Sequence, residues 1–231
     1  MLSQDDIKKL TGHAAVDLVE NDMVLGVGTG TTAHWFIMAL AEKVKAGLHC
    51  SAVPTSRLTE ELARRQGIPL TTLNLVEKIH LTVDGADEIA PGLRLIKGGG
   101  GALLQEKMVA AASDRLVIIA DHTKLVDTLG RFPLPVEVIP FGWKQVQRHI
   151  RDRYGIEAAL RTHGEQPFTT DHGHCILDCP FGRIDDAPAL NTALHDIPGV
   201  VETGLFTGLA SQALVGYPDG SIRSIKSTGP R

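Results

Sequence analysis

A lysine and a glutamate in one short segment carry the clearest catalytic chemistry of this sequence. Lys97 opens the run KGGGG at 97–101, and Glu106 follows in a stretch with helical character. A glutamate can move a proton beside a carbonyl group while a lysine stabilises the negative charge that develops on oxygen. Four consecutive glycines cost conformational entropy, so they favour a loop whose backbone approaches a ligand closely. The alternative interpretation is that the two charges lie on a solvated face.

A second motif, GVGTGTTA at 26–33, lies where a predicted strand ends and a predicted helix begins. The glycines permit a tight turn, the helix start presents free backbone N–H groups, and three threonine hydroxyls add donors. The loop therefore favours a phosphate, although a turn that only packs helix on strand would also need glycines. The segment fits the dinucleotide fingerprint too, but the second predicted strand exits through Pro54, Thr55 and Ser56 without the acid that NAD requires. The Walker pattern fails because no lysine follows the glycines.

A third motif places three carboxylates, Asp84, Asp87 and Glu88, directly after another predicted strand. Open α/β sheets bind their ligands at the carboxyl ends of the strands. Crowded anions are costly unless a cation or substrate hydroxyls compensate them, so such clusters often belong to binding sites. The alternative is an Asp-Gly turn with solvated acids.

All three motifs follow strands that alternate with helices. Apolar runs predict strands at 23–27, 49–53, 80–83, 93–96 and 116–120, and helical patterns occupy about 4–19, 33–46, 58–66 and 102–112. This alternation predicts a parallel α/β sheet of the Rossmann-like kind. After residue 131 the predicted order becomes β-α-β-β-α-β, the ferredoxin-like arrangement of a small α+β domain. We expect a Rossmann-like domain at 1–131 plus 205–231 and a second domain at 132–204.

Composition excludes several classes of function. The 231 residues carry a net charge of −4 without a basic cluster, which argues against a nucleic-acid partner. No apolar run reaches the roughly 18 residues of a membrane span, and the charged first ten residues do not form a signal peptide, so we expect a cytoplasmic protein. The three cysteines form no disulfide framework. His172, His174 and Cys175 are interpreted as a turn into a strand, so we expect no metal.

Taken in order, the segments GVGTGTTA, VDGADEI, IKGGGGALLQEK, IADHTK and FPLPVEVIP resemble those of the ribose-5-phosphate isomerase A family along nearly the whole chain. The resemblance implies a Rossmann-like main domain, a smaller α+β domain, and interconversion of D-ribose 5-phosphate and D-ribulose 5-phosphate through an enediolate. It also implies a place in the non-oxidative pentose phosphate pathway, no cofactor, a sugar phosphate as the small-molecule partner, and a homodimer.

The resemblance implies roles for individual residues. Glu106 matches the general base, Lys97 matches the residue that stabilises the enediolate, and Asp84 and Asp87 match acids that hold sugar hydroxyls and assist ring opening. The other implied substrate- and phosphate-binding positions are Thr29, Gly30, Thr31, Thr32, Gly85, Ala86, Gly98, Gly99, Gly100, Lys124 and Lys8. Many relatives have serine at the position of Thr31, which keeps the hydroxyl. Some have a serine run at 54–56, which leaves the role of Ser56 open.

Two other classes of function compete with the isomerase. A sugar-phosphate sensor on the same scaffold would need the phosphate loop but not the pair formed by Lys97 and Glu106, and it usually carries a DNA-binding domain for which 231 residues leave no room. A nicotinamide oxidoreductase would need the acid that is missing after the second strand.

Overall fold

The structure is a computed structural model that describes residues 1–227. Contacts divide the chain into two compact units. The first unit holds Met1–Ala86, Gln105–Lys124 and the described residues from Gly208, and the second holds Asp87–Leu104 and Leu125–Thr207. The second unit therefore includes the predicted small domain at 132–204 and, in addition, residues 87–104, 125–131 and 205–207, which we had assigned to the main domain.

The first unit is built on a six-stranded sheet whose strand order is β15-β14-β6-β3-β1-β2. The strands are β1 (Met23–Val27), β2 (Cys50–Pro54), β3 (Leu81–Asp84), β6 (Leu116–Asp121), β14 (Ala210–Gly216) and β15 (Ile222–Lys226). Five of them are parallel, and β15 pairs antiparallel with β14 at one edge. The chain runs from β1 outward to β2 on one side and to β3 on the other, so the strand order reverses between β1 and β3. In doubly wound sheets, ligands bind at this reversal.

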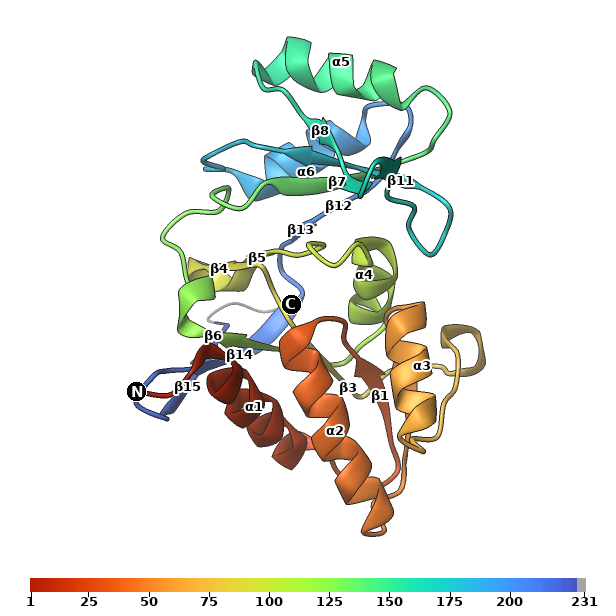
Figure 1. Cartoon of the computed structure of the whole chain (residues 1–231), viewed down its shortest axis with the longest axis vertical. Helices are drawn as coiled ribbons and strands as arrows, with labels where there is room; N and C mark the ends of the chain where they lie inside the picture. The colour runs from red at the N-terminus through yellow and green to blue at the C-terminus, as the bar shows by residue number, and fades with distance from the viewer. Residues whose placement is uncertain (228–231) are drawn as a thin grey trace. The chain divides into compact units, whose positions relative to one another are not determined.

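Helices cover the two faces of this sheet. They are α1 (Gln4–Ala15), α2 (Thr31–Lys45), α3 (Arg57–Arg65) and α4 (Leu103–Ala111), with 3-10 turns at Val16–Leu18, Leu73–Leu75 and His122–Lys124. The helices α1 and α2 lie side by side (Figure 1), and α2 buries Phe36 and Leu40 against Leu25 of β1. On the opposite face, Val109 of α4 packs with Val53. Alternate residues of each strand thus face different helices, as expected for a sheet buried on both sides.

The second unit contains a four-stranded antiparallel sheet of order β12-β7-β11-β8. Its elements are β7 (Leu134–Val138), α5 (Trp143–Tyr154), β8 (Ala159–Leu160), β11 (Cys175–Cys179), α6 (Ala187–His195) and β12 (Val200–Thr203). One apolar cluster joins Val146 of α5 and Leu194 of α6 to Val136 of β7 and Leu177 of β11, so both helices pack on the same face. This is the predicted β-α-β-β-α-β arrangement, and the α/β fold class predicted from the sequence is confirmed.

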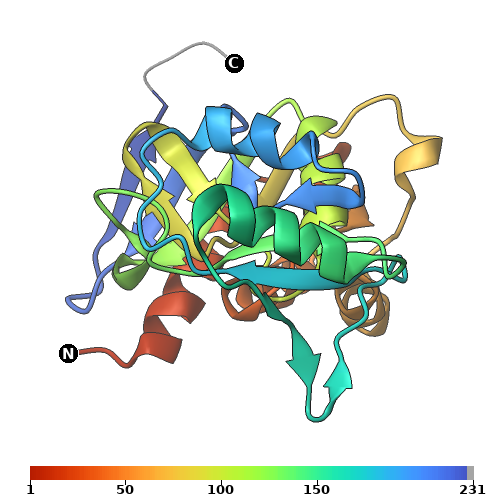
Figure 2. The same ribbon diagram turned by 90° about the horizontal axis from the view of Figure 1, so that it is seen from above.

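Two smaller elements complete the second unit. A hairpin, β9 (Thr162–His163) with β10 (Gln166–Pro167), extends away from the helices of this unit (Figure 2). A three-stranded antiparallel sheet has the order β13-β5-β4, with β4 (Glu88–Ala90), β5 (Arg94–Ile96) and β13 (Leu205–Phe206).

The position of β5 corrects one expectation. The sequence predicts that the strand at 93–96 joins the parallel sheet, but β5 pairs antiparallel with β4 and with β13 in the second unit. Only the 3-10 turn Pro91–Leu93 separates β4 from β5. A crossover between two parallel strands needs a dozen residues or more. The three-residue connection between β4 and β5 therefore permits only an antiparallel pair.

Candidate active site

The loop at 28–32, hereafter the threonine loop, joins β1 to α2 in the first unit. Gly30 has φ +115° and ψ 178°, a conformation open essentially to glycine alone, and α2 begins at the next residue. A side chain on Gly28 would place its Cβ 2.1 Å from Oδ1 of Asp84, so this position also requires glycine. The first turn of α2 carries free backbone N–H groups, the exposed Thr31 and the buried Thr32, and such a helix start favours an anion.

Asp84 braces the threonine loop from the neighbouring strand. Its carboxylate is buried, and its Oδ1 accepts hydrogen bonds from the backbone N of Thr29 at 3.0 Å and of Gly85 at 2.7 Å. β1 and β3 are the two strands between which the sheet order reverses. The acid thus lies where such folds bind ligands, and its first function there is to fix the loop.

The hydroxyl of Thr29 is engaged by the protein itself. It donates to Oγ of Ser56 at 2.8 Å, Ser56 donates to Oγ1 of Thr59 at 3.1 Å, and Thr59 donates to the carbonyl of Gly28 at 3.0 Å. Thr55 lies 2.8 Å from the same hydroxyl of Thr29. This ring of hydroxyls ties the threonine loop to the start of α3, where Ser56 also caps the helix by accepting from the N–H of Thr59. The structure therefore gives Ser56 the role that the sequence left open.

A pocket of about 420 Å³ borders the threonine loop between α2 and α3. Gly30 and Thr31 are among its lining residues, and Trp35, Leu58 and Leu62 contribute apolar side chains to the lining. The loop therefore faces open space at the start of α2.

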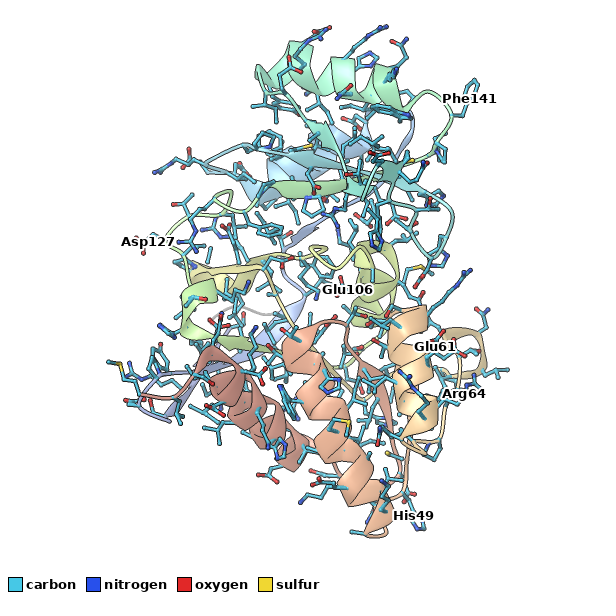
Figure 3. The ribbon with its side chains drawn as sticks, viewed as in Figure 1. His49, Glu61, Arg64, Glu106, Asp127 and Phe141 are labelled. Carbon is cyan, nitrogen blue, oxygen red and sulfur yellow. The ribbon has the colours of Figure 1, made fainter. Side chains whose placement is uncertain are left out.

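Glu106 lies on α4, and its side chain is buried (Figure 3). The neighbouring Gln105 donates from Nε2 to the carbonyl of Pro54 at 2.9 Å, which ties α4 to the end of β2. The base implied by the family resemblance therefore comes from a helix that is anchored to the carboxyl end of the parallel sheet.

Lys124 and Lys8 are half-buried residues of the first unit. Lys124 ends the 3-10 turn that follows β6, and Lys8 lies on α1, which packs against β6. Asp121, at the end of β6, accepts from the backbone N of Thr123 at 3.0 Å, from the Thr123 hydroxyl, and from Gln4 of α1 at 3.3 Å. Burial acts to raise the pKa of Asp121, but these hydrogen bonds and the charge of Lys124 outweigh it and hold the pKa below its usual value. The ionised carboxylate thus fixes both the turn and the start of α1.

The glycine loop, residues 98–101, belongs to the second unit together with Lys97 and Asp87. Lys97 follows β5 and is 2% exposed, its backbone N donates to the carbonyl of Gly204 at 2.9 Å, and its Nζ lies 5.4 Å from the centre of the Phe206 ring. Oδ2 of Asp87 accepts from the backbone N of Gly99 at 2.8 Å. Asp87 therefore braces the glycine loop as Asp84 braces the threonine loop.

Glu88, the third acid of the motif, has a different function. It is buried on β4, and its two carboxylate oxygens accept from the backbone N of Phe132 at 2.6 Å and of Gly130 at 2.7 Å. These bonds hold the segment that leads into β7.

The predicted residues are divided between the two units. Those in the first unit are Thr29, Gly30, Thr31, Thr32, Asp84, Gly85, Ala86, Glu106, Lys124 and Lys8, and those in the second are Asp87, Lys97, Gly98, Gly99 and Gly100. Sequence reasoning missed the hydroxyl ring, whose only signal was the segment PTS at 54–56, and it missed Arg161, which donates to the carbonyls of Gly98 and Gly99.

Other features bear on the expected chemistry. Within residues 1–227, no three side chains of His, Cys, Asp or Glu gather as metal ligands, and His174 contacts Glu137 at 2.9 Å. Burial raises the pKa of all three free cysteines, that of Cys179 to about 12, which makes them poor nucleophiles. No helix in this described part has the length and apolar character to cross a membrane.

Comparison with known sequences gives one family. A family model described as ribose 5-phosphate isomerase A (phosphoriboisomerase A) matches residues 51–220. A relative from Rhodopseudomonas palustris (strain HaA2), named ribose-5-phosphate isomerase A, is 51% identical over 231 residues, covering 97% of this chain and 99% of the relative. A relative of the same name from Bradyrhizobium diazoefficiens is 50% identical over 240 residues, covering 100% of this chain and 99% of its own.

Solved structures agree with this similarity. A D-ribose-5-phosphate isomerase in complex with phospho-erythronic acid is 38% identical, with a TM-score of 0.94 over 97% of this chain and 100% of the other. The ribose 5-phosphate isomerase from Plasmodium falciparum has the same TM-score and coverage at 35% identity.

Proposed function

Because this chain belongs to the ribose-5-phosphate isomerase A family, we propose that it interconverts D-ribose 5-phosphate and D-ribulose 5-phosphate, with Glu106 as the base. The observation that carries the proposal is the paired bracing of two glycine-containing loops by Asp84 and Asp87, with a lysine at the start of one loop and a helix N-terminus at the end of the other. An enediolate reaction on a sugar phosphate needs both an anion site and a charge stabiliser.

The first unit binds the phosphate end of the sugar. Backbone N–H groups at the start of α2 and the side chains of Thr31 and Thr32 surround the phosphate, and Lys124 and Lys8 supply positive charge. Thr29 contributes its backbone position rather than its hydroxyl, because that hydroxyl is engaged by Ser56 and its neighbours. Gly30, Gly85 and Ala86 line the path of the substrate.

The sugar hydroxyls contact Asp84 and Asp87, and one of these acids assists ring opening. The substrate in solution is largely cyclic, and its ring must open to expose the aldehyde at C1. The carboxylates are held by backbone N–H groups, so their remaining lone pairs are directed by the fold before the sugar arrives. Gly98, Gly99 and Gly100 let the backbone approach the same sugar closely.

Glu106 removes the proton from C2 of the open-chain aldose, and the electrons move to the carbonyl oxygen at C1. Lys97 stabilises that oxyanion. The proton on Glu106 is then delivered to C1, and the hydrogen of the C2 hydroxyl is exchanged toward O1, which leaves the ketone at C2. One base on one face suffices for both transfers. Phospho-erythronic acid, the ligand of the related structure, is a phosphorylated sugar acid, and we expect it to compete with the substrate here.

The remaining functional assignments are inferred from the family. We infer a homodimer in the cytoplasm that acts in the non-oxidative pentose phosphate pathway without a metal or organic cofactor. The lysine in the oxyanion role makes a metal unnecessary for charge stabilisation.

Conversion of ribose 5-phosphate, followed by NMR in D₂O with and without a chelator, tests the proposed function. We expect ribulose 5-phosphate to form with deuterium at C1, at a rate that the chelator leaves unchanged. Lack of conversion would contradict the activity, and a loss that one divalent ion restores would contradict cofactor independence.

A further inference from the structure

The glycine loop has no side chains with which to hold its own conformation. Gly98 and Gly101 have φ of +104° and +83°, and the backbone N of Gly101 donates to the carbonyl of Gly98 at 3.0 Å. Apart from this turn and the contact of Gly99 with Asp87, the loop depends on groups supplied from elsewhere in the second unit. The glycine loop directly follows Lys97, so its conformation must be fixed if the lysine is to act from a reproducible position.

Arg161, between β8 and β9, supplies such a group. Its Nη1 donates to the carbonyl of Gly98 at 2.8 Å and to that of Gly99 at 3.2 Å. Its Nε and Nη2 donate to the two carboxylate oxygens of Asp178 on β11 at 3.0 and 2.5 Å. The Arg161 side chain is 14% exposed, so the fork is held in one plane by a largely shielded bidentate pair.

Phe168 holds the other end of the loop. A Cβ on Gly101 would lie 2.3 Å from Cζ of the Phe168 ring, which therefore fills the space beside that glycine. The backbone N of Phe168 donates to the carbonyl of Arg161 at 2.9 Å, and the guanidinium of Arg161 lies 5.9 Å from the ring centre. One segment of the second unit thus fixes both ends of the loop.

The two contacts of Arg161 also set the direction of two backbone donors. The peptide bonds are trans, so the carbonyl of one residue and the N–H of the next point in opposite directions. Since the carbonyls of Gly98 and Gly99 point at Arg161, the N–H groups of Gly99 and Gly100 point away from it. The contact of the Gly99 N–H with Asp87 shows the direction for that donor, which faces the acid that we propose contacts the sugar.

We propose that Arg161, fixed by Asp178, is a positioning residue for the isomerase reaction: it orients the glycine loop so that the N–H groups of Gly99 and Gly100 face the substrate and Lys97 is fixed at the loop's start. The inference rests on the proposed function. Arg161 acts through the loop and touches no reacting atom in this mechanism.

Kinetics of Arg161→Lys, Arg161→Ala and Asp178→Asn test the proposal, at a temperature where circular dichroism shows each variant folded. Lysine keeps the charge but cannot form the fork. We expect kcat of both Arg161 variants to fall about 10- to 100-fold with KM changed less than about threefold, and Asp178→Asn to lose less. Millimolar ethylguanidinium should restore part of the kcat of Arg161→Ala. The control is Arg183→Lys, which alters an exposed pair with Asp185 in the same unit and should keep the parent kcat.

A folded Arg161→Lys enzyme with kcat within about twofold of the parent, or with a change confined to KM, would overturn the proposal. If Arg161→Ala does not fold, Arg161→Lys and Asp178→Asn carry the test. If the parent itself does not isomerise ribose 5-phosphate, the proposed function fails, and amide hydrogen exchange decides the positioning role separately. Exchange at Gly99 and Gly100 should be faster in Arg161→Lys than in the parent, and unchanged exchange would contradict the role of Arg161.

Discussion

The threonine loop and the glycine loop both follow short buried strands, and each is braced by one acid of the motif at 84–88. The threonine loop contributes a side chain of its own, the Thr29 hydroxyl, to a ring that runs through Ser56 and Thr59 back to the carbonyl of Gly28. The glycine loop has no side chains to contribute, so Arg161, more than 60 residues away in the chain, binds its carbonyls. A loop made of glycines can bring its backbone close to a ligand, but it has no side chains to stabilise its own conformation. Residues elsewhere in the same unit must then supply the stabilising contacts.

Substitution of Lys97, at the start of the glycine loop, should have the largest effect on turnover. We expect Lys97→Met to lower kcat about 10²- to 10³-fold, because it removes the charge that stabilises the enediolate, with a smaller change in KM. Steady-state kinetics with ribose 5-phosphate check this. Lys45→Met, at an exposed position near the end of α2, is the control and should behave as the parent. A Lys97→Met enzyme with near-parent kcat would contradict a role of Lys97 and the glycine loop in catalysis.

The same substitution in both loops should separate backbone strain from packing. Gly30→Ala meets open space, so we expect only the cost of its unusual φ and ψ, about 1–3 kcal/mol of unfolding free energy. Gly101 also has a positive φ, +83°, and an alanine there collides with the Phe168 ring, so we expect a further loss of about 1–3 kcal/mol from the collision. Urea unfolding of each variant measures both values.

Adding Phe168→Ala to each glycine variant tests whether the Phe168 ring supports the glycine loop specifically. The second substitution should offset part of the damage in Gly101→Ala, with a coupling energy of about 0.5–3 kcal/mol, and should simply add to Gly30→Ala. Equal coupling in the two loops would mean that Phe168 does not support the glycine loop specifically.

Much of this comparison was predictable from local sequence. The three motifs identified both loops and the acids, because glycines, hydroxyls and carboxylates at strand ends have a local physical meaning. Arg161 could not be found this way, since its contacts depend on how β8 and β11 bring distant residues to the loop. The strand predicted at 93–96 is placed in the wrong sheet because its apolar pattern is the same in both, although the three-residue connection from β4 excludes a parallel pair.

The threonine loop should affect binding more than turnover. We expect Thr32→Val to raise KM for ribose 5-phosphate about tenfold, because a neutral donor to the phosphate is lost, while Thr32→Ser stays near the parent. Turnover of ribose, which lacks the phosphate, should change little in either variant. Equal effects of Thr32→Val on both substrates would contradict binding of the phosphate at the threonine loop.

The effect expected at Asp121 is on stability, because its carboxylate fixes the turn that follows β6. We expect Asp121→Asn to lower the free energy of unfolding at pH 7 by about 1–2 kcal/mol. The pKa of Asp121 is lowered in the folded protein, so its contribution is complete above the unfolded value of about 3.9 and is lost as pH falls through the lower folded value. The difference between parent and variant should therefore shrink only below about pH 4 in pH-dependent urea unfolding. A difference that disappears near neutral pH would contradict this.

If Glu106 moves the proton, turnover of Glu106→Gln with ribose 5-phosphate in D₂O should be strongly impaired. Glutamine keeps the shape of the side chain and removes the base. We predict a fall in kcat of at least about 10²-fold, loss of deuterium incorporation at C1 in proportion, and retained binding of phospho-erythronic acid. The control Glu61→Gln, on α3 (Figure 3), should match the parent. Near-parent kcat and undiminished deuterium incorporation in Glu106→Gln would contradict the account and leave Asp87 as the candidate base.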